Sequence, residues 1–226
     1  MPESTRSPRV SLSAQAEHRL KTALITGAMM PGTRLVTKYL AMEMGMSITP
    51  VREALLRLAA VNALDMTPAQ TFIVPQSCLS RYQEINTLRK TLEIMALRES
   101  VSRMDSQHMR ALRRLHRHFS QAADVQPDKA MIANMLLRQR LYSIAMKPTL
   151  LELIEQLWMR LGPGYYFLWH QPGALQHIYQ HYDALLTLLE DRNGPGAEQL
   201  MTQIIENGNA ALIARHQQEK TLPVTG

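Results

Sequence analysis

Apolar side chains recur at helical spacing in residues 46–58. Four of them follow the i, i+3, i+4, i+7 rule that gives a helix one buried face: Val51, Ala54, Leu55 and Leu58. Ser47 is placed to cap this helix, and Pro50 lies in its first turn, where the missing N–H group costs no hydrogen bond. The pattern predicts a short amphipathic helix whose outer face is polar near its start.

Two earlier segments show the same helical period. Ser13 is expected to cap a first helix that ends at Gly27, and Thr37 is expected to cap a second helix that ends at Gly45. Between them, Pro31-Gly32 predicts a type II turn, because proline presets φ at the first central residue and glycine accepts positive φ at the second. This order of helices and tight turns is typical of a helix-turn-helix.

The period changes after the third predicted helix. Residues 64–66 and 72–74 read as short strands, and the proline-containing segment 67–71 joins them as a hairpin. Three helices followed by a small hairpin form a winged helix, whose wing can reach a DNA groove or the phosphates. We therefore predict a disordered tail in residues 1–11 and a winged helix-turn-helix DNA-binding domain in residues 12–76.

The remaining chain predicts an all-helical domain in residues 79–218 and a tail in residues 219–226. Apolar positions at helical spacing indicate six helices in antiparallel succession. The expected helices cover residues 79–104, 105–123, 127–146, 148 through at least 158, 174–191 and 195–216. The predicted fold class is mainly α, with an N-terminal winged helix-turn-helix and a C-terminal antiparallel six-helix bundle.

The composition agrees with a helical protein and narrows its partners. Apolar residues make up 46% of the chain and aromatic residues only 5%, so the core must rely on Leu, Ala, Ile, Val and Met. The formal net charge of +6 favours partners that carry phosphate or other anions.

Cys78 is the only cysteine, which fits a reducing cytoplasm. No apolar run approaches the roughly 20 residues that span a bilayer, so we expect a cytoplasmic protein with no membrane partner.

The start of the third predicted helix carries the chemistry of a DNA recognition helix. Its outward side chains include Ile48, Thr49 and Arg52, and a short helix that offers a hydroxyl and a forked cation fits the major groove. An arginine that binds guanine O6 and N7 contributes about 1–3 kcal/mol of discrimination between bases. The alternative is that Arg52 is only a solvated helix cation paired with Glu53 or its neighbours. Lys38, on the second helix, is either a phosphate contact or an ordinary surface lysine.

Residues 27–58 resemble a known family of bacterial transcription regulators. Residues 27–35 read G-A-M-M-P-G-T-R-L, and residues 40–58 read L-A-M-E-M-G-M-S-I-T-P-V-R-E-A-L-L-R-L. These segments closely resemble the GntR-family signature, G-x-x-x-P-G-x-x-L followed by L-A-x-x-x-G-V-S-x-T-P-V-R-E-A-L-x-x-L. The helical second part looks like the FCD effector-binding and dimerisation domain of the FadR subfamily. The resemblance implies a homodimeric, ligand-responsive repressor that binds a pseudo-palindromic operator in double-stranded DNA.

The resemblance also implies that Ser47, Thr49 and Arg52 contact phosphates or base edges. Two departures from the family pattern change this expectation. Ile48 stands where many members carry arginine, and it is a candidate for contact with a thymine methyl group. The wing has Gln70 near the place where an Arg-Gly pair is usual, so Gln70 is its candidate for DNA contact.

Many FCD domains bind a divalent metal through an aspartate and three histidines, and these positions are substituted in this chain. The corresponding residues are Asn134, Arg138, Tyr182 and Ile204. None is a good replacement for an imidazole or carboxylate ligand, so we predict no metal and no other cofactor. His177 and His181 have a metal-binding spacing but no identifiable third ligand. We interpret them as surface or packing histidines.

These substitutions suggest a different kind of effector. Arg138 would bring a fixed cation near Arg89 on the first helix of the bundle, and inward guanidinium groups favour a small anion such as a carboxylate or phosphate. The effector-binding candidates are Arg89, Asn134, Arg138 and Tyr182. The competing interpretation is structural, with Arg89 paired to Glu93 on the same helix and Arg138 pointing to solvent.

Other features also allow a functional and a structural interpretation. Residues 165–169 contain four of the chain's 12 aromatic residues and either gate a ligand cavity, cover a dimer interface or simply pack on the bundle. The arginines of residues 110–117 form either a second nucleic-acid surface or a solvated helix face.

The sequence contains no set of nucleophile, base and orienting acid, no glycine-rich phosphate loop and no metal triad, so we do not expect an enzyme. The alternative function is a small-molecule binding protein whose winged helix mediates protein contacts. Within the family, four segments resemble those of an enterobacterial regulator of biofilm and exopolysaccharide genes: residues 46–58, 68–70, 154–158 and 162–164. Such genes are therefore the expected targets.

Overall fold

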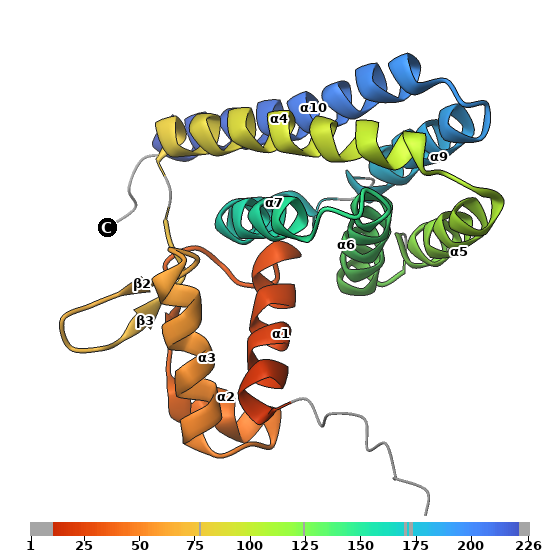
Figure 1. The fold of residues 1–226 in the computed structure, drawn as a ribbon. Helices are drawn as coiled ribbons and strands as arrows, with labels where there is room; N and C mark the ends of the chain where they lie inside the picture. The colour runs from red at the N-terminus through yellow and green to blue at the C-terminus, as the bar shows by residue number, and fades with distance from the viewer. Residues whose placement is uncertain (1–10, 77, 124, 170, 172–173, 222–226) are drawn as a thin grey trace, which may run out of the picture.

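The computed structural model places a small winged domain beneath a larger helical domain (Figure 1). It describes residues 11–76, 78–123, 125–169, 171 and 174–221. Helices dominate both domains, so the predicted fold class is confirmed. None of the described helices is apolar over the length needed to cross a membrane. The predicted N-terminal tail lies outside the described residues, except for Ser11.

Three helices form most of the winged domain: α1 (Leu12–Ile25), α2 (Thr37–Met44) and α3 (Ile48–Ala60). α1 packs directly against α3. The buried face of α3 consists of the four positions that the sequence pattern predicts: Val51, Ala54, Leu55 and Leu58. Because these side chains are fully buried, the direction in which the opposite face of α3 points is fixed by the core.

A three-stranded antiparallel sheet completes this domain, with the strand order β1-β3-β2. β2 (Asp65–Met66) and β3 (Phe72–Ile73) form the wing within the predicted strand segments, and β1 (Arg34–Leu35) pairs with the other edge of β3. The sequence pattern does not predict β1, because two residues after a tight turn show no alternation. Leu35 lies opposite Phe72, and both are buried, so this pair joins the sheet to the core.

Two predicted helix caps are wrong. The Ser11 hydroxyl, and not that of Ser13, accepts a hydrogen bond from the first turn of α1 at 3.2 Å, whereas Ser13 is buried within the helix. α2 begins at Thr37 itself, with Val36 as its N-cap residue. Gly45 ends α2 in the left-handed conformation, at a φ of 66°, as the sequence predicts.

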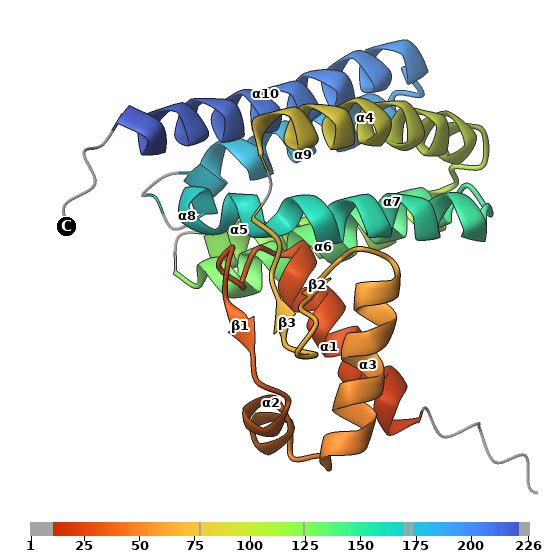
Figure 2. The same ribbon diagram turned by 90° about the vertical axis from the view of Figure 1, so that its left-hand side faces the viewer.

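Six long helices form the described part of the C-terminal domain: α4 (Leu79–Ser102), α5 (Ser106–Ala123), α6 (Pro127–Ser143), α7 (Pro148–Leu161), α9 (Ala174–Glu190) and α10 (Gly194–Thr221). α4 and α10 lie side by side, and α7 passes beneath α4 (Figures 1 and 2). α10 continues to Thr221, so the predicted domain end at residue 218 is too early. Residues 222–226 of the predicted tail lie outside the described part of the chain.

The segment between α7 and α9 is helical in short pieces. A 3-10 turn, η1 (Gly162–Tyr165), follows α7 directly, and the single-turn helix α8 (Tyr166–Trp169) follows η1. The aromatic cluster predicted at residues 165–169 therefore lies on a compact turn between two long helices.

The two domains meet where the end of α1 touches η1. Glycine allows this close approach, because a Cβ on Gly162 would lie 2.0 Å from the backbone oxygen of Leu24, and a Cβ on Gly27 would lie 2.7 Å from that of Gly162. Beside this contact, Arg160 donates hydrogen bonds from Nε (3.2 Å) and Nη2 (2.7 Å) to the carbonyl oxygen of Val61, directly after α3. We call these contacts the domain joint.

Candidate DNA-reading surface and effector cavity

The first turn of α3 presents predicted DNA-binding side chains to solvent. Ser47, Ile48 and Thr49 are exposed, and Ile48 is 51% exposed although it is apolar. Ser47 is the N-cap residue, as predicted, but its side chain makes no capping hydrogen bond within the described backbone. α2 and the start of α3 lie at the end of the winged domain farthest from the helical domain (Figures 1 and 2). Access to this end is therefore open.

The structure brings Arg52 and Gln70 together. Arg52 Nη2 donates a hydrogen bond to Gln70 Oε1, which links α3 to the wing. The partner of Arg52 is thus Gln70 and not Glu53, which lies 4.0 Å from the guanidinium of Arg57, and whether Arg52 contacts DNA stays a prediction. Gln70 closes the wing turn by donating its N–H to the oxygen of Thr67 at 2.8 Å.

Gln70 adopts a left-handed backbone conformation, with a φ of 57°. Residues other than glycine are disfavoured in this conformation by roughly 1–2 kcal/mol, and the final position of such a hairpin loop usually holds glycine. The Gln70 side chain provides the acceptor for Arg52.

Lys38, the remaining DNA-binding candidate, is exposed in the first turn of α2 and is not part of the Arg52–Gln70 pair. The contacts of all these side chains with DNA stay predictions.

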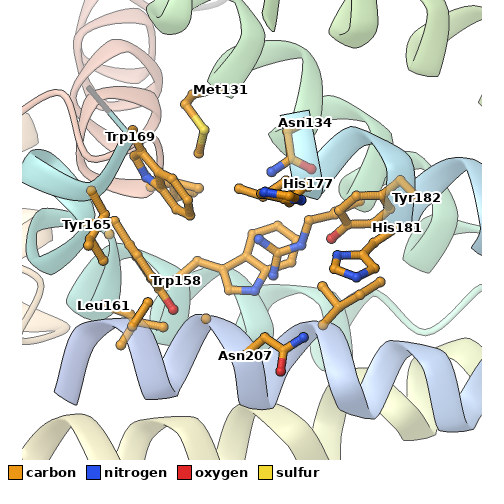
Figure 3. Close-up of a pocket in the computed structure, with 18 of the residues that line it drawn as sticks. Met131, Asn134, Trp158, Leu161, Tyr165, Trp169, His177, His181, Tyr182 and Asn207 are labelled. Atoms are coloured by element: carbon orange, nitrogen blue, oxygen red, sulfur yellow. The ribbon is translucent and has the colours of Figure 1, made fainter. Parts of the chain in front are cut away.

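A cavity of about 440 Å³ lies in the helical domain, in the size range of small-molecule sites (Figure 3). All four predicted effector-binding residues line it: Arg89, Asn134, Arg138 and Tyr182. Most of the wall is apolar or aromatic and includes both tryptophans of the chain, Trp158 and Trp169. Ile25, at the end of α1, also lines the cavity, so the DNA-binding domain forms part of the wall.

Glu93, on α4, is fully buried beside this cavity and binds both arginines. Arg89 Nε donates a hydrogen bond to Glu93 Oε1, and Arg138 Nη2 donates to both carboxylate oxygens at 3.0 Å. Tyr142 OH (2.6 Å) and Trp158 Nε1 (2.8 Å) also donate to this carboxylate. The predicted Arg89–Glu93 pair is therefore present, whereas the alternative in which Arg138 points to solvent is wrong. We call these five residues the Glu93 cluster.

The charges within the Glu93 cluster are fixed by its partners. Burial alone would raise the pKa of Glu93, but the charges of Arg138 and Arg89, with the hydrogen bonds that the carboxylate accepts, lower this pKa to about 2. Burial, and then the charge of Glu93, raise the pKa of Tyr142, which stays a neutral donor. Two guanidinium groups share one carboxylate, so the cluster carries a net charge of +1.

The residues that line the cavity also carry polar atoms that are buried without a partner. None of the described residues that line the cavity is acidic. Within the same set, three buried polar atoms have no hydrogen-bond partner in the described structure: Asn134 Oδ1, Arg138 Nε and Trp169 Nε1. All three atoms are fully buried, so an occupant of the cavity reaches them only if neighbouring side chains move.

The positions that hold a metal in many FCD domains meet at this cavity, but their side chains do not fit a cation. The four residues Asn134, Arg138, Tyr182 and Ile204 all line it. The permanent charge of Arg138 repels a second cation, and Ile204 offers no ligand atom. In the described part of the chain, no group of three or more histidine, cysteine, aspartate or glutamate side chains can hold a metal ion.

The histidines of α9 also belong to the cavity. His177 and His181 line it, next to Asn134 and Tyr182 respectively (Figure 3). His177 is exposed and His181 is half-buried, which agrees with their interpretation as surface or packing histidines. The i, i+4 spacing is the only sequence signal for their place at the cavity, because it puts both rings on one side of α9. Met131 is a further lining residue that the sequence reasoning missed.

The aromatic segment of residues 165–169 lies at one end of the cavity. The rings of Tyr165 and Trp169 stack with 4.6 Å between their centroids, and both side chains line the cavity. Trp169 also faces the domain joint, because a Cβ on Gly27 would lie 3.3 Å from its Cδ1 atom. A single indole ring therefore contacts both the cavity and the end of the DNA-binding domain.

The arginines of α5 have a structural role at one position. Arg113 donates hydrogen bonds to Asp183 (2.6 Å) and Glu190 (2.6 and 2.9 Å) and thereby ties α5 to α9. Arg110, Arg114 and Arg117 are exposed. Exposure of these three arginines fits both a solvated helix face and a second nucleic-acid surface, so both interpretations stay predictions.

Two family profiles cover most of the chain. The profile of bacterial regulatory proteins of the gntR family matches residues 12–74, and that of the FCD domain matches residues 84–207. The chain is also 39% identical to the HTH-type transcriptional regulator McbR of Escherichia coli K12 over 219 residues, which are 96% of this chain and 99% of McbR. The chain belongs to the GntR family. It is a transcription regulator with an FCD ligand-binding domain, as the signature in residues 27–58 predicts.

Other GntR-family proteins share this architecture. The solved structure of E. coli McbR/YncC superposes with a TM-score of 0.85 at 40% identity and covers 92% of this chain and 99% of its own. A GntR regulator from Rhodococcus sp. RHA1 has the same fold, with a TM-score of 0.71 at 16% identity over 91% of this chain and 99% of its own. The transcriptional repressor RspR of E. coli K12 is 22% identical over 205 residues, 90% of each chain.

Proposed function

We propose that this GntR-family regulator is a cytoplasmic homodimer that represses transcription from a pseudo-palindromic operator, and that a small anion in the FCD cavity changes its affinity for that operator. One observation carries the proposal. Ile25 of the DNA-binding domain lines the cavity together with Arg89 and Arg138 of the helical domain. An occupant of the cavity therefore contacts both domains at once.

The DNA-binding part of the proposal assigns a role to each exposed candidate. Thr49 and Arg52 read base edges in the major groove, and Ile48 packs against a thymine methyl group. Gln70 holds Arg52 from the wing, so the guanidinium enters the groove from a defined position. The remaining candidates, Lys38 and Ser47, contact phosphates and fix the register of the protein on the duplex.

The coupling between ligand and operator follows the domain joint. Trp169 faces both the cavity and Gly27, and Arg160 holds the carbonyl oxygen of Val61 after α3. A ligand that displaces Trp169 shifts the end of α1, and the winged domain moves with it relative to α7. A coupling free energy of about 1–3 kcal/mol would change operator affinity 5- to 150-fold.

Salt dependence separates this proposal from its alternative. Genomic footprinting first identifies the bound sites, and fluorescence anisotropy then measures affinity for one of them over a series of salt concentrations. Neutralisation of DNA phosphates makes the logarithm of the affinity fall steeply with the logarithm of the salt concentration. If no fragment of its own upstream region bound at any salt, the proposal would fail in favour of a small-molecule binding protein whose winged helix contacts another protein.

The metal content of the purified protein tests another part of the proposal. We expect no resident metal or other cofactor, because the cavity has two guanidinium groups and no acidic residue among its described lining residues. Elemental analysis of protein purified without added metal should find less than stoichiometric zinc, nickel and manganese. A stoichiometric amount of any of them would overturn this part.

The names of two relatives support the proposed repression of transcription. McbR is named a transcriptional regulator and RspR a repressor, which supports repression without catalysis for this chain. The expectation that the target genes concern biofilm or exopolysaccharide stays a prediction, which the footprinted sites would test directly.

A further inference from the structure

We propose that the outer face of α5 is a second DNA-binding surface, on which Arg110, Arg114 and Arg117 hold phosphates of the duplex that flanks the operator. This inference rests on the proposed function, in which the winged domains hold the operator, and it adds a contact outside the operator. We call these three residues the arginine face. Contacts to phosphates carry no base preference, so the arginine face adds affinity without adding sequence specificity.

α5 carries charge of one sign only. Its 18 residues include four arginines and no aspartate or glutamate. The buried side of the helix consists of Leu112, His116, Phe119 and Ala123. The arginine face lies on the opposite side, because its members fall between these positions in the helical period, and all three side chains are exposed. The helix therefore presents only positive charge of its own to solvent.

Nearby acidic residues leave most of the arginine face without a counter-charge. The two carboxylates of α9 that reach α5 bind Arg113, which is the one arginine of this helix that forms an ion pair in the described part of the chain. Asp105, just before the helix, lies within electrostatic range of Arg110, but it caps the helix by accepting the N–H of His108 at 2.7 Å. The arginine face is therefore open to an anionic partner.

The spacing of the arginine face argues against a role in solvation alone. Arg110 and Arg114 are four residues apart, and Arg114 and Arg117 are three apart, so neighbours on the helix surface carry like charges. Like charges at this spacing destabilise a helix, whereas opposite charges stabilise it. A polyanion that lies along the helix removes this repulsion.

Duplex DNA matches the arginine face in length and in charge. The helix rises about 10 Å from Arg110 to Arg117, and a duplex carries about six phosphates over the same length. A guanidinium group holds two phosphate oxygens at once through parallel hydrogen bonds. Each of the three arginines can therefore bind a phosphate of its own.

The position of α5 makes the flank of the operator its occupant. α5 lies at the edge of the helical domain, on the side away from the wing (Figures 1 and 2). A duplex held by the winged domain is close to α5 at high effective concentration, whereas an acidic protein would have to be recruited from solution. Because α2 and the start of α3 lie at the far end of the winged domain, the flank reaches α5 by bending toward the helical domain.

Operator duplexes of two lengths test this contact with the full-length protein. The first duplex contains only the footprinted operator, and the second extends it by about 20 base pairs of unrelated sequence at each end. Fluorescence anisotropy should show that the wild type binds the extended duplex about tenfold more tightly at low salt. The three further phosphate contacts should also steepen the dependence of log affinity on log salt by about 2.7 per protomer.

Two triple variants test the assigned residues. Arg110→Gln/Arg114→Gln/Arg117→Gln should bind the operator-length duplex like the wild type and should gain nothing from the extended one. Arg110→Lys/Arg114→Lys/Arg117→Lys is the matched control, and it should keep most of the gain because the charges remain. Thermal unfolding should show no loss of stability in the glutamine variant, since the substitutions relieve repulsion between like charges.

Energy transfer between dyes at the two ends of the extended duplex tests the bend. The transfer should rise when the wild type binds and should rise less with the glutamine variant. Equal affinity of the wild type for both duplexes, as expected if the arginine face bound an acidic protein instead, would overturn the inference. A full gain in the glutamine variant would overturn it as well.

The operator-length duplex separates this inference from the proposed function. Tight binding of that duplex without a gain on the extended one would refute the second surface and leave the regulator intact. Failure to bind either duplex would refute the proposed function and, with it, the second surface.

Discussion

Arg138 places a permanent cation at a position where many FCD domains have a metal ligand, and Glu93 compensates part of its charge. A guanidinium has donors in fixed directions and cannot be removed by a chelator. Arg89 and Arg138 come from α4 and α6, so a single carboxylate also joins these helices. The Glu93 cluster therefore serves both the stability of the bundle and the charge of the cavity.

Glu93→Gln is expected to remove a pH-dependent part of the stability. The pKa of Glu93 falls from its ordinary value of 4.5 to about 2 on folding, so between these pH values the unfolded chain binds more protons than the folded protein. The contribution of this group is fully present above about pH 4.5 and is lost as the pH falls toward 2, on the order of 3 kcal/mol in total.

Urea unfolding of the wild type and Glu93→Gln at pH 6 and pH 3 measures this contribution. The variant should be less stable at pH 6 by about 3–5 kcal/mol, because two buried guanidinium groups lose their carboxylate. It should also lose less stability than the wild type between pH 6 and pH 3. Equal losses in the two proteins would show that Glu93 is not the titrating group.

Gln70→Gly and Gln70→Ala separate the two roles of this wing residue. Both variants remove the acceptor for Arg52, so both should lose the same part of the discrimination between the operator and a scrambled sequence. Only glycine relieves the left-handed backbone, so Gln70→Gly should be about 1 kcal/mol more stable than Gln70→Ala. Anisotropy and thermal unfolding check the two effects, and unchanged discrimination would remove Gln70 from the account.

At the scale of elements, the junction of α7 and η1 connects the domains. Gly162→Ala would place a Cβ against the backbone of Leu24, and we expect it to cost about 1–3 kcal/mol and to weaken the response of operator binding to a ligand. Gly194→Ala, at the start of α10, is the control, since its Cβ would meet only Val101 at 3.5 Å. Calorimetric unfolding measures the cost, and equal stability of the two variants would contradict the close approach.

The long helices could be predicted from apolar residues at helical spacing, and the apolar stripe is clearest in α3, α5 and α7. β1 and the N-cap residue of α1 could not be predicted from the sequence, and the physical reason differs between them. β1 has only two residues, which are too few to alternate, and it exists because β3 offers it a free edge. Ser11 and Ser13 are both capable caps, so the choice depends on where the core holds the start of α1.

The whole molecule is proposed to act as a dimer, and α4 offers an apolar strip for this contact. Leu88 and Met95 lie seven residues apart on α4, and each is 48% exposed. The double variant Leu88→Lys/Met95→Lys should sediment as a monomer and bind the operator about 100-fold more weakly, because each half-site is then bound independently. Val125→Lys, at a residue that is 74% exposed after α5, should stay dimeric. An unchanged dimer in the double variant would exclude this face.

The candidate sites could be predicted only in part from the sequence. The predicted effector-binding residues Asn134, Arg138 and Tyr182 line one cavity, and their contact with a ligand stays a prediction. The sequence predicts Glu93 only as a local partner of Arg89, because Arg138, Tyr142 and Trp158 reach it from helices that are distant in the sequence. The sequence likewise does not predict the hydrogen bond from Arg52 to Gln70 in the wing, since it depends on how the hairpin lies against α3.

The measurement that tests the central claim most directly is the affinity of the wild type and Arg52→Ala for a footprinted operator and for a scrambled duplex of equal length. The wild type should prefer its operator by at least about 10³-fold at physiological salt. Arg52→Ala should lose about 5- to 150-fold of that preference, with little change in affinity for the scrambled duplex. Full discrimination by Arg52→Ala would contradict the assignment of α3 as the element that reads DNA.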